Sequence, residues 1–154
     1  MLKNHPKICL YKPEIPQNTG NIARLSAATG SRLCLVGPFG FATCDKNLER
    51  PGLDYWPYLD LEIHDGIEDL LAQHEGKVAF FSKKAKKVYT ECPVDTQLFV
   101  FGQESKGLPD SLTERFPQDQ YRIPIYHPGV RSLNLANAVS IIVYDQLHRR
   151  GATF

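Results

Sequence analysis

Short runs of consecutive apolar residues alternate along the chain with segments in which apolar residues recur every three or four positions. The continuous runs are typical of strands buried on both faces, and glycine, proline or polar residues end each of them. They predict strands at residues 8–11, 33–36, 78–81, 98–101 and 121–125. Pro124 in the last run indicates a sheet edge or an irregular exit, because proline cannot donate a ladder hydrogen bond.

Helical spacing is clearest at residues 134–149, where one face collects Leu135, Val139, Ile142, Val143 and Leu147. A second helix is predicted to begin at Asn18, which is suited to capping, and to end at Gly30, which suits the left-handed position after a helix. Further helical segments are expected at 67–74, 111–115 and, as a single turn in an irregular region, 45–49. This alternation predicts an α/β fold, with a mainly parallel sheet covered by helices on both faces.

Composition narrows the class of protein. The 154 residues predict a single domain spanning 1–154, and 42% hydrophobic with 23% charged residues are typical of a folded globular chain. A formal net charge of +1 means that contact with nucleic acid would need a local basic patch. No segment resembles a membrane span or a signal peptide, and the four cysteines form no C-x-x-C pair. These features favour a reducing, cytoplasmic location without membrane association.

Several common catalytic motifs are missing from the sequence. Neither G-x-G-x-x-G nor G-x-x-x-x-G-K-[ST] occurs, which disfavours dinucleotide-dependent dehydrogenases and P-loop nucleotidases. Ser105 lacks the G-x-S-x-G setting of a hydrolase nucleophile, and the five histidines show no H-x-x-x-H spacing. We therefore expect neither serine hydrolysis nor a bound metal.

Ligands of open parallel sheets bind at the loops that follow the strands, here expected at 13–21, 82–87, 102–109 and 126–134. In the first loop, helical spacing lets Arg24 project toward the same rim as Asn18. In the third, Glu104 lies between two glycines, where a ligand can approach bare backbone. In the fourth, Ser132 and Asn134 precede a helix whose free N–H groups can bind a polar ligand edge. The plain alternatives are helix caps, a solvated arginine and an ordinary turn.

Taken together, these three segments resemble the motifs of the SPOUT superfamily of RNA 2′-O-ribose methyltransferases: N-T-G-N-I-x-R, F-G-x-E-x-x-G-L-P and R-S-x-N-L-x-N-A. The similarity extends from Ile8 to about His148, and the chain looks like the minimal single-domain branch, which methylates the wobble nucleotide, cytidine or uridine, of tRNA. The resemblance implies a C-terminal deep trefoil knot, a homodimer, and S-adenosylmethionine as methyl donor with no metal. It implies tRNA as partner, through the anticodon stem-loop, rather than DNA.

The resemblance also implies roles for residues at matching positions. The catalytic set would be Asn18, Arg24, Glu104 and Asn134. The cofactor pocket would use Phe81, Gly102, Ile123, Ser132 and Leu133, with glycine at 102 making room for the cofactor. Candidates for binding RNA phosphate are Lys83, Lys84, Arg131 and Arg149. Arg24 would either activate the ribose hydroxyl or bind phosphate, the second being easier for a guanidinium that stays protonated.

Other functions remain open at this point. A 2′-O-methyltransferase of rRNA, or of another tRNA position, would carry the same motifs. A non-catalytic protein that binds RNA or S-adenosylmethionine is disfavoured by the complete motif set. A nucleotide-binding α/β module unrelated to methyl transfer is the third alternative.

Overall fold

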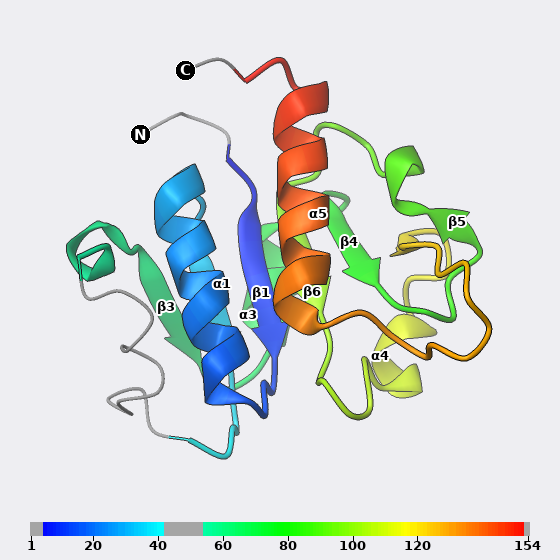
Figure 1. Ribbon diagram of the computed structural model, residues 1–154, viewed down its shortest axis with the longest axis horizontal. Coiled ribbons are helices and arrows are strands. Elements are labelled where there is room, and N and C mark those ends of the chain that lie inside the picture. The colour runs from blue at the N-terminus through cyan, green and yellow to red at the C-terminus, as the bar shows by residue number, and fades with distance from the viewer. Residues whose placement is uncertain (1–4, 42–53, 153–154) are drawn as a thin grey trace.

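The computed structural model describes residues 5–41 and 54–152, whose framework is a seven-stranded sheet (Figure 1). In chain order the strands are β1 (Lys7–Tyr11), β2 (Leu33–Val36), β3 (Leu61–His64), β4 (Val78–Phe81), β5 (Lys87–Val88), β6 (Leu98–Phe101) and β7 (Gln120–Arg122). In space they follow the order β3-β2-β1-β6-β4-β7-β5, and every pairing within the described residues is parallel. The carboxyl ends of the strands therefore meet one edge of the sheet, at the lower end of Figure 1.

Helices cover both faces of this sheet. On one face, α1 (Pro16–Thr29) and α5 (Leu135–Arg149) pack side by side, and on the other lie α3 (Glu68–Gln73) and α4 (Asp110–Thr113). Two short 3-10 helices, η1 (Trp56–Tyr58) and η2 (Tyr89–Glu91), lie in the connections. Within the described residues, no helix has the length and apolarity needed to cross a membrane. The predicted α/β fold with a parallel sheet is confirmed.

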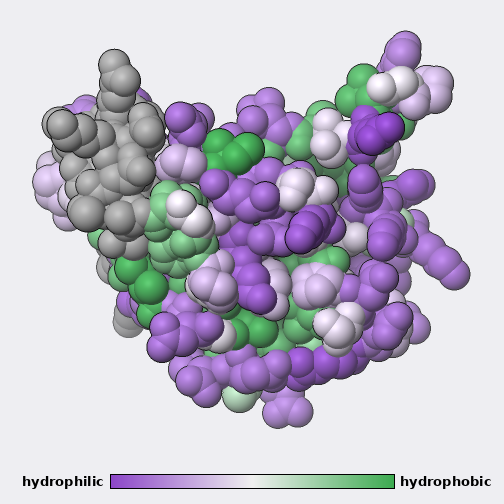
Figure 2. Space-filling model, turned by 90° about the horizontal axis from the view of Figure 1, so that it is seen from below, coloured by the Kyte–Doolittle hydropathy of each residue, from purple (hydrophilic) through white to green (hydrophobic). Residues whose placement is uncertain are grey.

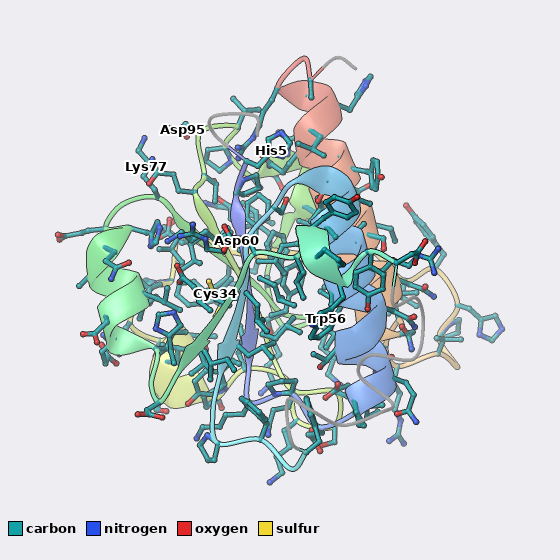
Figure 3. The ribbon with its side chains drawn as sticks, turned by 90° about the vertical axis from the view of Figure 1, so that its left-hand side faces the viewer. His5, Cys34, Trp56, Asp60, Lys77 and Asp95 are labelled. Atoms are coloured by element: carbon teal, nitrogen blue, oxygen red, sulfur yellow. The ribbon has the colours of Figure 1, made fainter. Side chains whose placement is uncertain are left out.

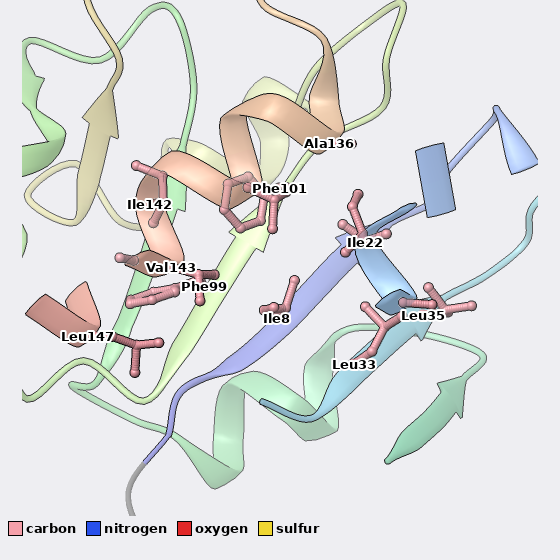
Figure 4. Close-up of a cluster of buried hydrophobic side chains, with 14 of the residues drawn as sticks. Ile8, Ile22, Leu33, Leu35, Phe99, Phe101, Ala136, Ile142, Val143 and Leu147 are labelled. Atoms are coloured by element: carbon pink, nitrogen blue, oxygen red, sulfur yellow. The ribbon is translucent and has the colours of Figure 1, made fainter. Parts of the chain in front are cut away.

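Side chains of the central strands are buried on alternate faces. Ile8 and Leu10 are fully buried in the cluster beneath α1 and α5, where Ile142 of α5 packs (Figure 4). Cys9, between them, points to the opposite face and joins Leu70 of α3. Because both faces are covered, the sequences of these strands are continuous apolar runs and do not alternate between apolar and polar residues.

Helix α1 begins earlier than predicted. Pro16 occupies its first turn and Ile15 is its N-cap, so the prediction that Asn18 caps this helix was wrong. Proline suits the first helical position, because its φ is already helical and the N–H it lacks would have no partner there. The predicted end is confirmed: Gly30 follows the helix in the left-handed conformation with φ 70°.

The sequence pattern does not reveal two of the strands. β3 is an edge strand of mixed polarity, and β5 has only two residues inside a lysine-rich segment. The strand predicted at 121–125 ends at Arg122, two residues before Pro124, which confirms the irregular exit. The helical turn expected at 45–49 lies outside the described residues.

Strands from late in the chain occupy places between earlier ones. β6 lies between β1 and β4, and β7 lies between β4 and β5. This order brings the loops after β4, β6 and β7 together with the segment that enters α5. The deep knot implied by the resemblance stays a prediction.

Candidate active site

A cleft of about 470 Å³ lies at the carboxyl edge of the sheet, within the roughly 300–1,000 Å³ typical of small-molecule sites. Figure 2 shows this end of the molecule, where hydrophilic residues cover most of the surface and apolar residues show between them. The walls come from residues 81–84, 101–108, 121–123 and 131–135, and Ile15 with Asn18 completes the rim from α1. All four loops predicted from the strand order thus contribute to one cleft.

Eleven of the thirteen predicted site residues line this cleft: Asn18, Phe81, Lys83, Lys84, Gly102, Glu104, Ile123, Arg131, Ser132, Leu133 and Asn134. The two that do not are Arg24 and Arg149. Arg24 is exposed on α1, with its guanidinium carbon 6.0 Å from the centre of the Tyr55 ring. Arg149 pairs with Asp145 at 2.9 Å and donates to the carbonyl of Cys92 at 2.8 Å. Their predicted roles stay predictions.

Aromatic side chains form an apolar floor in the cleft. The ring of Phe81 stacks on that of Phe101, with centroids 4.9 Å apart and an interplanar angle of 14°. Tyr121 lies 6.2 Å from Phe81, and burial raises the pKa of its hydroxyl to about 12. Ile123 and Leu133 add aliphatic surface. Such a floor suits a planar group or a cation, because aromatic faces attract both.

Glu104 binds the backbone that leads into α1. Its Oε2 accepts a hydrogen bond from the N–H of Glu14 at 2.9 Å, and its Oε1 accepts one from the N–H of Ile15 at 3.2 Å. Ile15 is the N-cap of α1 and has no polar side chain with which to cap the helix. Glu104 therefore supplies, from 89 residues away, the carboxylate that a helix N-terminus favours.

A second carboxylate makes this contact reciprocal. Oε1 of Glu14 accepts hydrogen bonds from the N–H of Ser105 at 3.1 Å and from its hydroxyl at 2.7 Å. These two bonds lower the pKa of Glu14. Nearby, the side-chain amide of Gln103 donates to the carbonyl of Lys12 at 3.0 Å. We call these contacts, between residues 12–15 and 103–105, the loop clasp; it fixes the start of α1 to the wall of the cleft.

Position 102 requires glycine, because the backbone of the same loop lies where a side chain would be. A Cβ added at this position would lie 2.2 Å from the carbonyl carbon of Gly107 and 2.3 Å from the N atom of Leu108. Gln103 and Gly107 close this narrow loop with a pair of backbone hydrogen bonds of 3.2 and 2.9 Å. A side chain at this position would therefore collide with the loop itself, while Gly102 also lines the cleft. Its predicted role in making room for the cofactor stays a prediction.

Two asparagines join α1 to α5 at the rim. The side-chain amide of Asn134 donates to Oδ1 of Asn18 at 3.0 Å. Oδ1 of Asn134 caps α5, accepting from the N–H groups of Ala136 at 2.9 Å and Asn137 at 3.3 Å. Asn18 is 6% exposed, so this bond provides a partner for a buried amide. The pair sets the spacing of the two helices beside the cleft.

Basic side chains lie on the outer part of the cleft. Lys83 and Lys84 follow β4, Arg131 precedes α5, and all three are exposed. Lys84 pairs with Asp110 at 3.3 Å, an exposed contact that contributes little to stability and can exchange for another anion. These three cations form a local basic patch on a chain whose net charge is close to zero, and their role in binding phosphate stays a prediction.

The chemistry available in the cleft is mainly that of binding and orientation. Among the described residues that line it there is no histidine or cysteine, and both oxygens of Glu104 accept backbone N–H groups. Amides, hydroxyls and backbone groups surround an apolar floor, with cations outside. The arrangement favours a ligand with a planar or cationic part next to a polyanion, rather than covalent catalysis by a nucleophilic cysteine.

The sequence analysis named none of Glu14, Gln103 and Tyr121 as site residues, although Glu14 and Gln103 lie in loops that it predicted at the ligand edge. Glu14 and Ser105 are 91 residues apart, and no local spacing reports such a pairing. Tyr121 had a usable signal, because it lies one residue before the end of a short strand whose carboxyl end was predicted to face the ligand.

Comparisons with known proteins agree with this geometry. The chain matches the SpoU rRNA Methylase family over residues 5–144. A protein from Methylovorus glucosotrophus named tRNA (cytidine(34)-2′-O)-methyltransferase is 43% identical over 141 residues, which cover 90% of this chain and 91% of that protein. A protein of the same name from Burkholderia ambifaria is 39% identical over 149 residues, which cover 94% of this chain and 95% of that protein.

Solved structures share the fold. One, described as "Structural insights into the 2-OH methylation of C/U34 on tRNA", is 39% identical with a TM-score of 0.87, and the match covers 98% of this chain and 100% of that one. The SpoU methyltransferase AviRb from Streptomyces viridochromogenes, solved with AdoMet, has a TM-score of 0.83 at 20% identity, and the match covers 100% of this chain and 61% of that one.

Proposed function

The chain belongs to the SpoU rRNA methylase family, and we propose that it is a single-domain methyltransferase that uses S-adenosylmethionine to methylate the ribose 2′-hydroxyl of the wobble nucleotide, cytidine or uridine, in tRNA. One observation carries the proposal. The predicted cofactor residues and three of the four predicted catalytic residues line one cleft at the carboxyl edge of the sheet. The two named relatives act, by their names, on cytidine 34 of tRNA.

The cleft fits S-adenosylmethionine in size and in chemistry. Phe81, Ile123 and Leu133 offer apolar surface to an adenine ring, and the aromatic floor attracts a sulfonium cation. Backbone groups beside Gly102 and the hydroxyl of Ser132 offer polar partners. When bound, S-adenosylmethionine supplies an electrophilic methyl group for the ribose oxygen.

The chain's own residues position the ribose and stabilise the charge that forms as the hydroxyl loses its proton. Glu104 is poorly placed to take that proton, because both of its oxygens already accept backbone N–H groups. A guanidinium is a donor-only cation in proteins, so we assign Arg24 stabilisation of negative charge on the 2′-oxygen or the neighbouring phosphate. Asn18 and Asn134 hold the two helices that frame the cleft. Positioning of this kind supplies proximity without a covalent enzyme intermediate.

We also propose a homodimer in which Arg24 of one copy serves the cleft of the other. Arg24 is exposed and lies outside the cleft of its own chain. On the same helical layer, Ile141 and Tyr144 of α5 are 37% and 49% exposed, and a second copy would bury this apolar surface.

Mixed dimers test this arrangement. Arg24→Ala and Asn134→Ala are each expected to be nearly inactive alone, because one removes the cation and the other disturbs the cleft. Refolded together, they should regain about one quarter of wild-type activity, since random pairing rebuilds one intact site in half of the dimers. No recovery would mean that each cleft uses its own Arg24.

Binding of tRNA is assigned to the basic rim. Lys83, Lys84 and Arg131 would contact phosphates of the anticodon stem-loop, with Arg149 as a further predicted contact. We propose that the reaction takes place in the cytoplasm.

Transfer of labelled methyl from S-adenosylmethionine to total tRNA tests the proposed function. Nuclease digestion and mass spectrometry of the product should give 2′-O-methylated cytidine or uridine from the wobble position. Arg24→Ala should abolish transfer while binding of S-adenosylmethionine persists. Labelling of rRNA but not of tRNA would instead support the alternative substrate.

A further inference from the structure

Outside the cleft, three side chains with metal-binding chemistry meet on the sheet face that α3 covers. Cys34 lies on β2, and its strand partner across the parallel pairing is Glu62 of β3. His64 lies two residues beyond Glu62, and side chains two apart on a strand point to the same face. In Figure 3, Cys34 lies on the α3 side of the strands, whereas Trp56 lies near α1. Strand pairing alone thus brings a thiol, a carboxylate and an imidazole together.

The ligand atoms of this trio lie at distances close to those of a metal site. Oε2 of Glu62 is 3.0 Å from Nε2 of His64 and 3.5 Å from Sγ of Cys34. One ligand atom from each residue lies within 4.8 Å of the other two. In tetrahedral zinc sites, bonds of about 2.0–2.3 Å place neighbouring ligand atoms roughly 3.3–3.6 Å apart. Small side-chain rotations would therefore complete the coordination.

We propose that Cys34, Glu62 and His64 bind a divalent transition-metal ion of the zinc class. A thiolate, an imidazole and a carboxylate form a borderline-soft donor set, which binds ions of this class in preference to magnesium or calcium. Binding forms three coordinate bonds and releases the thiol proton to solvent, with water taking the fourth position. The ion would be neutralised by the two negative ligands.

The surroundings of the trio also suit an ion. Arg32 donates to Oε1 of Glu62 at 2.7 Å and pairs with Asp60 at 2.7 Å, which holds the carboxylate with Oε2 toward the other two ligands. Such outer contacts orient the ligands of metal sites. The side chains of Glu62 and His64 are 28% and 22% exposed, while Cys34 is buried. An ion can therefore enter from the edge of the sheet.

A charge pointing inward on an edge strand has another known use, which is to discourage pairing with a second sheet. That use explains Glu62 on β3, one of the two edge strands of the sheet. It gives no reason for a buried thiol and an imidazole to approach the same carboxylate oxygen. The two explanations differ in one measurable property, which is the binding of a metal through sulfur.

Cobalt(II) is the probe for this site, because its bond to a thiolate gives a charge-transfer absorption band that oxygen and nitrogen ligands do not produce. The full chain is treated with a chelator, reduced and titrated with Co²⁺. We expect the band to saturate at one ion per chain and to disappear when Zn²⁺ is added. Cys34→Ser should abolish the band, and His64→Gln should weaken Co²⁺ binding about tenfold or more.

Matched controls separate this site from other thiols. Cys92→Ser removes another buried cysteine, and Cys44→Ser removes one outside the described residues. Both should keep the band. His64 is partly exposed, so His64→Gln still tests the site if circular dichroism shows that Cys34→Ser does not fold. A wild-type protein without the band, or a band that survives in folded Cys34→Ser, would overturn the proposal.

Discussion

Replacing Glu104 with alanine tests whether this residue acts by holding the loop clasp. The change removes both acceptors from the N–H groups of Glu14 and Ile15 and takes a negative charge away from the start of α1. Each lost hydrogen bond costs about 0.5–1.5 kcal/mol, and loss of a favourable charge at a helix N-terminus costs roughly 0.3–1 kcal/mol. Water can hydrate the freed N–H groups and so reduces part of this loss. The free energy of unfolding should therefore fall by about 1–2 kcal/mol.

Thermal and chemical unfolding measure this loss. For a chain of this size each kcal/mol shifts Tm by about 2–4 °C, so Glu104→Ala should lower Tm by roughly 2–8 °C. Glu104→Gln keeps one oxygen acceptor and should lose about half as much. The exposed glutamate at the end of α4 offers a matched control, because Glu114→Ala should leave Tm within about 1 °C of the wild type.

Amide hydrogen exchange gives the residue-level answer. The N–H groups of Glu14 and Ile15 should exchange faster in Glu104→Ala, whereas those in β3 should be unchanged. Wild-type stability and protection in a variant that has lost methyl transfer would refute this reasoning and make Glu104 a catalytic group.

Three further changes have predictable results. Gly102→Ala should lower the free energy of unfolding by about 1–3 kcal/mol and weaken binding of S-adenosylmethionine, because its Cβ meets the backbone of Gly107. Calorimetry of unfolding and of ligand binding measures both effects. Wild-type values for both would contradict the close approach. Asn134→Ala should lower the free energy of unfolding, measured with urea, by about 1 kcal/mol, because α5 loses its cap. Asn134→Asp should keep the cap and lose only the hydrogen bond to Asn18. Equal losses in the two variants would count against this assignment. The pKa of Tyr121 is about 12 in the folded chain and about 10 when unfolded, so the unfolded state loses its proton first as pH rises. Stability should therefore fall from pH 10 to 12, and less steeply in Tyr121→Phe, as followed by urea unfolding at each pH; parallel curves would argue against a buried hydroxyl.

The position of the cleft could be predicted from the sequence, because parallel strands end at the same edge and their loops must meet there. Buried strands were found because a strand covered on both faces is apolar throughout, as at residues 33–36 and 98–101. β3 escaped detection for the opposite reason, since an edge strand carries polar residues such as Glu62.

Contacts between distant residues could not be predicted from a single sequence. The partner of Glu104 depends on how the loops after β1 and β6 meet, and these lie 89 residues apart. Gly102 was noticed as a glycine at the end of a strand, but the sequence gives no sign that the backbone of Gly107 and Leu108 lies where its side chain would be. The trio of Cys34, Glu62 and His64 escapes any search for local metal-binding spacing, because 28 residues separate Cys34 from Glu62.

Methyl transfer to a defined anticodon stem-loop tests the central claim most directly. Two RNAs are compared that differ by one atom, one with a ribose and one with a 2′-deoxyribose at the wobble nucleotide. The purified protein should transfer labelled methyl from S-adenosylmethionine to the first RNA and none to the second. Equal labelling of both RNAs would contradict methylation at that 2′-oxygen.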